Sequence, residues 1–184
     1  MENNNIIKAV YNSDTIRVYQ AYNKVIATEA VRNGTFGKNF KMDRMTWIKP
    51  SFLWMMYRSG WASKENQEYV LAIDMKREAF DFLVNNAVMS KYQEGIYESY
   101  EEWKKLIRNS DVRVQWDPER DIYGNPLECR SIQLGMRGQA IERYVNEWIV
   151  SVTDISEYVR SLKIKILKEQ DILDLLPNEK IYEI

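Results

Sequence analysis

The chain has no histidine and only one cysteine, Cys129, among its 184 residues. The absence of histidine excludes Ser-His and Cys-His catalytic pairs, histidine-ligated metals and imidazole acid–base steps. A single thiol can form neither an intrachain disulfide nor a four-cysteine zinc site, so we expect no bound metal. Any catalysis must therefore use carboxylates, lysine, arginine, tyrosine, hydroxyls or backbone amides.

Glycine, proline and long apolar runs are also scarce. The 7 glycines and 4 prolines are scattered and form no linker, which indicates one domain over residues 1–184. No window approaches the run of about 18 apolar residues that spans a membrane. The N-terminal residues lack the basic start and apolar stretch of a signal peptide. We therefore expect a cytoplasmic protein with no membrane partner.

Charge is balanced, whereas aromatic residues are plentiful. Lys and Arg number 26 and Asp and Glu number 27, so the net charge is −1. This balance excludes a general electrostatic attraction to nucleic acids but leaves room for a local basic groove. The 12 tyrosines and 6 tryptophans supply large apolar surfaces and flat rings.

Strand-like and helix-like segments alternate along the chain and predict an α+β fold with a mainly antiparallel sheet, continuous or split, flanked by helices. A long turn, 118–126, would join two strands of a hairpin. The expected strands are 15–22, 69–75, 112–117, 127–134 and 147–153. The expected helices are 24–33, Pro50 to Gly60, 77–89, 97–108, 139–146 and 156–168, with a short helix at 171–176.

Two N-terminal segments place polar groups beside large aromatic rings. The first strand ends with Tyr19, Gln20 and Tyr22, and it carries Arg17. The plainer interpretation of this strand is an edge strand whose tyrosines pack on the core. A second segment precedes and opens a helix, whose first free N–H groups favour a phosphate. Its polar and aromatic candidates are Arg44, Thr46, Trp47, Lys49, Ser51 and, inside the helix, Arg58. The apolar stripe of that helix, Phe52, Met55 and Met56, is better explained as core.

Two further segments belong to the expected hairpin. The end of its first strand carries Gln115, Trp116, Asp117, Glu119 and Arg120, and its return strand carries Arg130 and Gln133. An exposed charged turn and a solvent-facing strand are the plainer interpretations. A further alternative is a magnesium-dependent nuclease element at Asp74–Lys76, with Asp117 as a second acidic residue.

Four stretches together resemble a known family. They read TIRVYQAYNKVIATEAV, RMTWIKPSFLWMMYRSGWA, VRVQWDPERD and RSIQLG, in this order. These long motifs are similar to the family called domain of unknown function 4291. The resemblance covers about residues 7–155, which leaves the C-terminal helices of 156–184 outside it, and it implies no particular activity.

A second resemblance concerns function. The strand end Tyr19-Gln20-Ala21, the helix 24–33 and Gly34-Thr35-Phe36 are similar to the opening of ADP-ribosyltransferase-like folds. In those folds the strand backbone holds the nicotinamide amide of NAD, and a later glutamate holds the ribose hydroxyl. Gln20 stands where an arginine or histidine is expected, so another cation would have to meet the pyrophosphate.

The resemblance implies roles for the candidate residues. Glu119, with Asp117 as its substitute, would stabilise charge on the ribose in a transferase that uses NAD or a related nucleotide. The other candidates would bind the nucleotide: cations Arg44, Lys49 and Arg120 its phosphates, and Trp47, Trp116 or Tyr22 its ring. The acceptor would be a protein, a nucleic acid such as RNA, or water.

Two alternatives use the same residues. One is a non-catalytic module that binds a nucleotide or a short nucleic acid through the same rings and cations. The other is an interaction protein whose aromatic surface is an interface. The transferase hypothesis predicts that Gln20, Arg44 and Glu119 converge in one cleft, where the strand 15–22, the segment 44–51 and the turn 115–120 meet.

Overall fold

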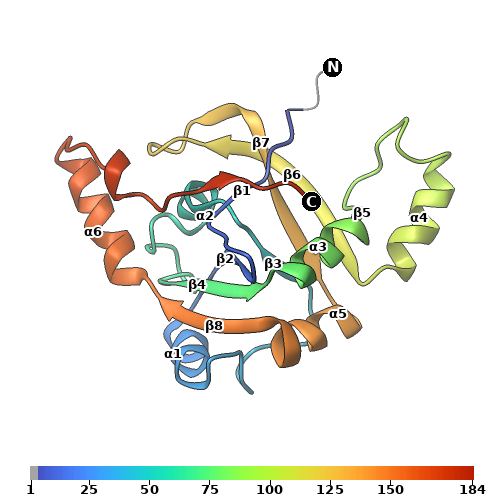
Figure 1. Cartoon of the computed structure of the whole chain (residues 1–184), viewed down its shortest axis with the longest axis horizontal. Helices are drawn as coiled ribbons and strands as arrows, with labels where there is room; N and C mark the ends of the chain where they lie inside the picture. The colour runs from blue at the N-terminus through green and yellow to red at the C-terminus, as the bar shows by residue number, and fades with distance from the viewer. Residues whose placement is uncertain (1–3) are drawn as a thin grey trace.

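Two β-sheets form the centre of the structure, which we describe from a computed structural model for residues 4–184 (Figure 1). The large sheet has the strand order β3-β7-β6-β5 and the small sheet has the order β2-β4-β8. All pairs are antiparallel except β5 with β6. The large sheet consists of β3 (Thr46–Ile48), β7 (Pro126–Met136), β6 (Val112–Arg120) and β5 (Val88–Met89). The small sheet consists of β2 (Thr15–Tyr22), β4 (Tyr69–Lys76) and β8 (Ile149–Asp154).

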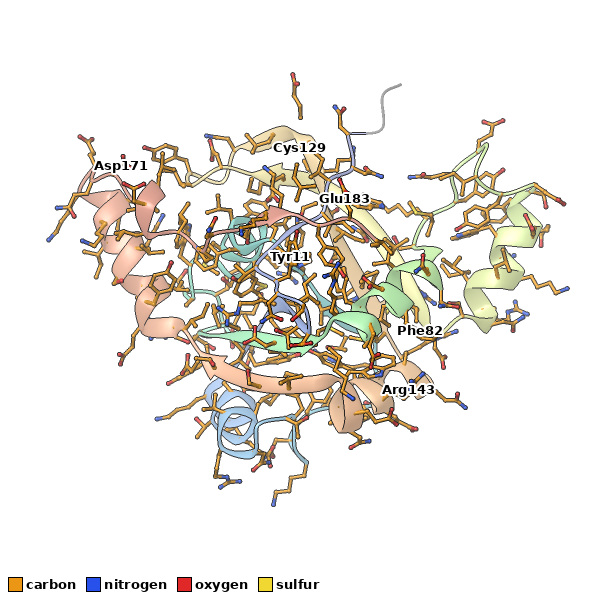
Figure 2. The ribbon with its side chains drawn as sticks, in the orientation of Figure 1. Tyr11, Phe82, Cys129, Arg143, Asp171 and Glu183 are labelled. Carbon is orange, nitrogen blue, oxygen red and sulfur yellow. The ribbon has the colours of Figure 1, made fainter. Side chains whose placement is uncertain are left out.

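The two sheets share one hydrophobic core. Alternation along each strand sends one set of apolar side chains toward the partner sheet. Val18 and Ile73 of the small sheet and Ile48, Ile132 and Leu134 of the large sheet are almost completely buried in this cluster. Side chains fill the centre of the molecule, where Tyr11 lies in this view, whereas Asp171 lies at its left edge (Figure 2).

Helices close the edges and the outer face of the small sheet. A second core lies on that outer face, where Tyr19 and Val70 pack against Phe52, Met55 and Leu162. The helices are α1 (Lys24–Asn33), α2 (Phe52–Ser59), α3 (Arg77–Asn85), α4 (Tyr100–Asn109), α5 (Gly138–Arg143) and α6 (Ser156–Leu167). Helices α6 and α4 lie at opposite ends of the molecule (Figure 1).

The C-terminal segment returns to the N-terminal one. A π-helical turn, η1 (Tyr144–Trp148), precedes β8, and a 3₁₀ turn, η2 (Leu173–Leu175), follows α6. Strand β9 (Lys180–Ile181) then pairs antiparallel with β1 (Lys8–Ala9). Tyr182 is buried at this junction, where its ring packs edge-on against Tyr11 and Phe80.

The predicted α+β fold with mainly antiparallel sheets flanked by helices is confirmed. The main departures from the sequence predictions lie in short strands. Strand β3 precedes α2 within a segment that we expected to be loop and helix, and β5 follows α3, which ends at Asn85. The expected turn 118–126 is shorter, because β6 continues to Arg120 through an irregularity between Pro118 and Arg120. The expected helix 139–146 is divided into α5 and the turn η1.

Candidate ligand-binding site

Two adjoining cavities open where β2 and β3 lie side by side. Their volumes are about 540 and 260 Å³, and both are lined by Tyr22, Arg44, Thr46 and Asn66. We call them together the basic hollow. The larger cavity is further lined by Asn23, Val25, Ile26, Asn39, Phe40 and Lys41. The smaller one is further lined by Gln20, Ala21, Met45, Trp47, Lys49, Met55, Arg58, Glu65 and Gln67.

The backbone places the hollow beside the ends of β2 and β3 and the start of α1. The N–H of Tyr19 donates to the carbonyl of Lys49 at 2.7 Å, which joins β2 to the chain just after β3. Asn23 ends β2 and caps α1, because its side chain accepts from the N–H of Ile26. Ser51 likewise caps α2 through the N–H of Trp54. The chain therefore leaves the sheets at Asn23 and again near Ser51, and the ends of β2 and β3 lie beside open space.

A buried hydrogen-bond network forms the floor of the hollow. The Nε2 of Gln20 lies 2.9 Å from Thr46 Oγ1, 2.9 Å from Tyr22 Oη and 3.0 Å from the carbonyl of Trp47, so its two N–H groups are shared among three acceptors. Its Oε1 accepts from the hydroxyl of Tyr144 at 2.9 Å. Burial raises the pKa of Tyr144 well above its ordinary value, so the hydroxyl keeps the proton that it donates. The amide of Gln20 is thus fully engaged within the protein.

The walls of the hollow carry an excess of positive charge. Lys41, Arg44, Lys49 and Arg58 line it, together with one acidic residue, Glu65. The ion pairs found within residues 4–184 are Arg17–Asp74, Arg137–Asp111 and Arg143–Glu147, so none of these four cations is part of one. Cations that lack acidic partners around one concavity attract anions.

Lys49 differs from the other three cations because it is buried. Its residue is 7% exposed, its Nζ lies 3.5 Å from the carbonyl of Trp47, and the ring of Trp54 lies 5.2 Å away. Burial and, to a smaller extent, the charge of Arg58 together lower the pKa of Lys49 to about 7, while Asp117 acts in the opposite direction. This amine therefore loses its proton near neutral pH.

Glu119 lies outside the hollow, at the N-terminus of α2. Its Oε1 accepts from Ser51 Oγ at 2.9 Å and from the N–H of Arg120 at 2.9 Å. Glu179 reaches the same helix end, where its Oε1 accepts from the N–H of Phe52 at 2.6 Å. Burial and, to a smaller extent, the nearby charge of Glu119 together raise the pKa of Glu179 to about 8. The segment 115–120 thus meets the segment 44–51 at Ser51 and not beside Gln20 and Arg44.

Asp117 belongs to a polar row on the large sheet. Its two oxygens accept from Gln115 Nε2 at 2.8 Å and from Gln133 Nε2 at 2.6 Å. Gln115 in turn accepts from the hydroxyl of Ser90 at 3.2 Å. None of these residues lines either cavity. The row is a hydrogen-bonded strand face of the kind that we gave as the plainer interpretation.

The remaining candidates are also engaged elsewhere. Arg17 makes a two-point ion pair with Asp74, with both N–O distances 2.9 Å, which also removes Asp74 from a free metal-binding role. Tyr19 is buried in the second core, where its ring packs against Phe52. Two arginines and one tryptophan lie around the hairpin. Arg120 stacks on the ring of Tyr57 at 3.9 Å, Arg130 donates to the carbonyl of Trp116, and the Trp116 ring packs partly buried against the first core.

Seven of the candidate residues therefore line the hollow: Gln20, Tyr22, Arg44, Thr46, Trp47, Lys49 and Arg58. Sequence analysis did not select the loop residues Asn39, Lys41, Glu65 and Asn66. The loop before β3 offered one signal, since Lys38 and Lys41 flank an aromatic residue there. Nothing comparable marks Glu65 and Asn66, which reach the site only through the fold.

The described part of the chain gives two further findings. Within residues 4–184, no group of three or more cysteine or acidic side chains lies close enough together to hold a metal ion. No helix in this range is both long and apolar enough to cross a bilayer.

Comparison with known proteins gives a family. A search of curated proteins found no match to this chain. A family model described as "Domain of unknown function (DUF4291)" matches residues 6–182, which is nearly the whole chain and extends beyond the stretch that carries the sequence motifs. The protein belongs to the DUF4291 family.

Proposed function

We propose that the basic hollow binds a nucleotide and that the protein uses NAD or a related nucleotide as its substrate. The observation that carries this proposal is the convergence of Lys41, Arg44, Lys49 and Arg58 on one cavity without ion-pair partners in the described residues. Cations of this kind bind phosphate groups, and arginine does so in a two-point geometry.

The size and the walls of the hollow support a ligand larger than phosphate alone. Small-molecule sites commonly have volumes of about 300–1,000 Å³ and combine apolar walls with a few polar groups. The larger cavity has a volume of about 540 Å³ and is lined by the rings of Tyr22 and Phe40. The smaller one adds the indole of Trp47. Flat rings beside cations suit the base and the phosphates of a nucleotide.

If the protein transfers ADP-ribose from NAD, the carboxylate that stabilises the ribose would be a different residue from the Glu119 that the sequence suggested. Cleavage of the bond between nicotinamide and ribose develops positive charge on the sugar, which a nearby carboxylate stabilises. Glu65 lines the hollow, whereas the side chain of Glu119 is buried against Ser51. In this proposal Glu65 faces the ligand, and Glu119 holds the start of α2 that forms one wall.

A non-catalytic binding module is the second proposal. It is favoured by one observation, that Glu119 and Asp117 both lie outside the cavities that hold the cations. The cations and rings alone would bind a free nucleotide or the end of a short RNA, and a protein acceptor would then play no part.

Ligand-dependent unfolding tests the binding part of the proposal. Wild-type protein is heated with NAD, ADP-ribose, ATP, inorganic phosphate or a short RNA, because a ligand that binds only the native state raises the melting temperature. We expect nucleotides to raise it and Arg44→Ala to remove most of that shift. The matched control is Arg32→Ala, since Arg32 is exposed on α1 and lines neither cavity. Equal shifts in the two variants would refute the site.

Turnover separates the two proposals. Release of nicotinamide from NAD is measured for wild type, Glu65→Gln and Glu119→Gln. We expect turnover in the wild type, a loss in Glu65→Gln with little change in NAD affinity, and a stability change in Glu119→Gln. Binding of NAD without nicotinamide release in the presence of candidate acceptors would favour the non-catalytic module.

A further inference from the structure

The amine of Lys49 combines three properties that the binding of phosphate does not require. The residue is buried, yet it lines the smaller cavity. Among the described residues its one acceptor is the carbonyl of Trp47, at the long distance of 3.5 Å. It is part of no ion pair within residues 4–184. A buried ammonium without a carboxylate partner is strongly disfavoured, so the neutral amine is the form that this environment prefers.

The nearby ring does not reverse this preference. A lysine ammonium over an aromatic face gains about 0.5–2 kcal/mol, whereas the cost of burying an unpaired charge is several kcal/mol. The guanidinium of Arg58 lowers the pKa of Lys49 further, and Asp117 opposes it without forming an ion pair. The resulting pKa of about 7 makes a neutral amine abundant at physiological pH.

We infer that Lys49 is a nucleophilic amine that captures aldehydes entering the basic hollow, and that the neighbouring cations select aldehydes carrying phosphate groups. The second half of this inference rests on the proposed function. A desolvated lysine beside another cationic group is the arrangement that activates an amine for attack on a carbonyl. Arg44 and Arg58 lie in the same cavity as Lys49 and supply the anion-binding groups.

The step is a condensation. The lone pair of Nζ attacks the carbonyl carbon, and the carbonyl oxygen takes up a proton to give a carbinolamine. The amine loses its two hydrogens, the carbonyl oxygen leaves with them as water, and a C=N bond replaces the C=O bond. No oxidant or reductant is consumed. The open form of the terminal ribose of ADP-ribose is a phosphate-linked aldehyde of this kind, whereas the riboses of intact NAD are closed by glycosidic bonds.

The chain offers a matched control in Lys64. Its Nζ also lies over an aromatic ring, 5.8 Å from Tyr57, but the residue is exposed and the amine donates to the carbonyl of Arg58 at 2.9 Å. Exposure alone would make Lys64 the more accessible target. Preferential reaction at Lys49 would therefore reflect the environment of its amine.

The test maps the adducts of wild-type protein, so it does not depend on a variant that folds. The protein is incubated near pH 7.5 with pyridoxal 5′-phosphate, which combines an aldehyde, a ring and a phosphate, or with ADP-ribose. Borohydride or cyanoborohydride then reduces the imine, and peptide mass spectrometry locates it. We expect modification of Lys49 to exceed that of Lys64 at least tenfold, and ATP to protect Lys49. The matched aldehyde 5′-deoxypyridoxal, which lacks the phosphate and cannot close into a cyclic hemiacetal as pyridoxal does, should modify Lys49 at least tenfold less.

The outcomes separate the two parts of the inference. Modification spread over the lysines according to exposure, in protein whose melting temperature still rises with nucleotides, would refute the role of Lys49 and leave the proposed function intact. Equal modification of Lys49 by 5′-deoxypyridoxal and pyridoxal 5′-phosphate, with no protection by ATP, would refute phosphate selection and the proposed function together. Lys49→Arg should abolish the reducible adduct at this position while Lys64→Arg leaves it unchanged.

Discussion

Two buried tyrosines allow the network beneath the hollow to be tested quantitatively. Tyr144 and Tyr19 are both almost completely inaccessible, 0% and 1% exposed. The hydroxyl of Tyr144 donates to Gln20 Oε1 at 2.9 Å, whereas the hydroxyl of Tyr19 has no hydrogen-bond partner among the described residues. Replacing each by phenylalanine removes one oxygen and keeps the ring. The two variants therefore differ mainly in whether the lost hydroxyl made a hydrogen bond.

The expected effects on stability have opposite signs. Tyr144→Phe leaves the buried Oε1 of Gln20 without its donor, which costs about 1–3 kcal/mol. For a protein of this size each kcal/mol shifts the melting temperature by roughly 2–4 °C, so we expect a decrease of about 2–12 °C. Tyr19→Phe removes an unpaired buried hydroxyl and leaves the edge-on contact with Phe52 in place. We expect its stability to be unchanged or increased.

Urea unfolding of the two variants and the wild type measures the difference directly. The midpoint of Tyr144→Phe should fall with an unchanged slope, and that of Tyr19→Phe should stay or rise. A loss in Tyr19→Phe as large as that in Tyr144→Phe would show that the hydroxyl of Tyr19 is satisfied in solution. It would then contradict our reasoning from the hydrogen-bond network.

Three further predictions concern binding, pH and packing. Arg44→Ala should weaken nucleotide binding about ten- to hundredfold in calorimetry, which corresponds to the loss of one charged hydrogen bond, while Arg32→Ala should bind normally. The pKa of Glu179 is raised from its ordinary 4.5 to about 8. The stability that its neutral form contributes is therefore full below about pH 4.5 and is lost as the pH rises through 8. Glu179→Gln should flatten this part of the curve of stability against pH, and an unchanged curve would contradict the prediction. Gly135→Ala would place a Cβ 2.8 Å from Met45 Sδ and 3.0 Å from the ring of Trp47, two residues that line the smaller cavity. We therefore expect a loss of about 1–3 kcal/mol in stability and weaker ligand binding, and wild-type values of both would refute these contacts.

Residue patterns located the long elements well. The β-rich run that ends at Tyr22 and the helix capped by Asn23 and Gly34 appear as β2 and α1 with the expected bounds. Their signals are local, since side-chain alternation, a capping side chain and a glycine in the left-handed region lie within a few residues of each other. The short strand β3 carries no such signal, because three residues gain strand geometry only from their pairing with β7.

The candidate site was predictable where it follows the chain and unpredictable where it depends on the fold. Tyr22 and Arg44 line both cavities, as their positions at element ends indicated. Glu119 was selected because it stands beside a tryptophan and an arginine at a strand end. The strand pairing of β6 with β7 is irregular between Pro118 and Arg120, and this irregularity decides to which side of β6 the side chain of Glu119 points. The local sequence does not show which side that will be.

Gln20 shows how a resemblance and a structure can assign different roles to one residue. The resemblance gives this position a nucleotide-binding role, yet both ends of its amide are bonded to the protein. A ligand could gain a hydrogen bond from Gln20 only by displacing Thr46, Tyr22 or Tyr144, and the net gain of such an exchange is small. The residue therefore contributes to the site by holding Thr46 and Tyr22, which line both cavities.

Nucleotide binding in the basic hollow and aldehyde capture by Lys49 place opposite demands on the charge of this amine. An amine that attacks a carbonyl must be neutral, and a neutral amine attracts phosphate far less than an ammonium does. Phosphate binding near pH 7 then depends on the guanidinium groups of Arg44 and Arg58 and on Lys41, which lines the larger cavity. A bound phosphate beside Lys49 would raise its pKa by favouring the ammonium. The aldehyde must therefore reach Nζ while the phosphate stays at the arginines, so ligands in which the two groups are separated by a sugar should react faster than small phosphorylated aldehydes.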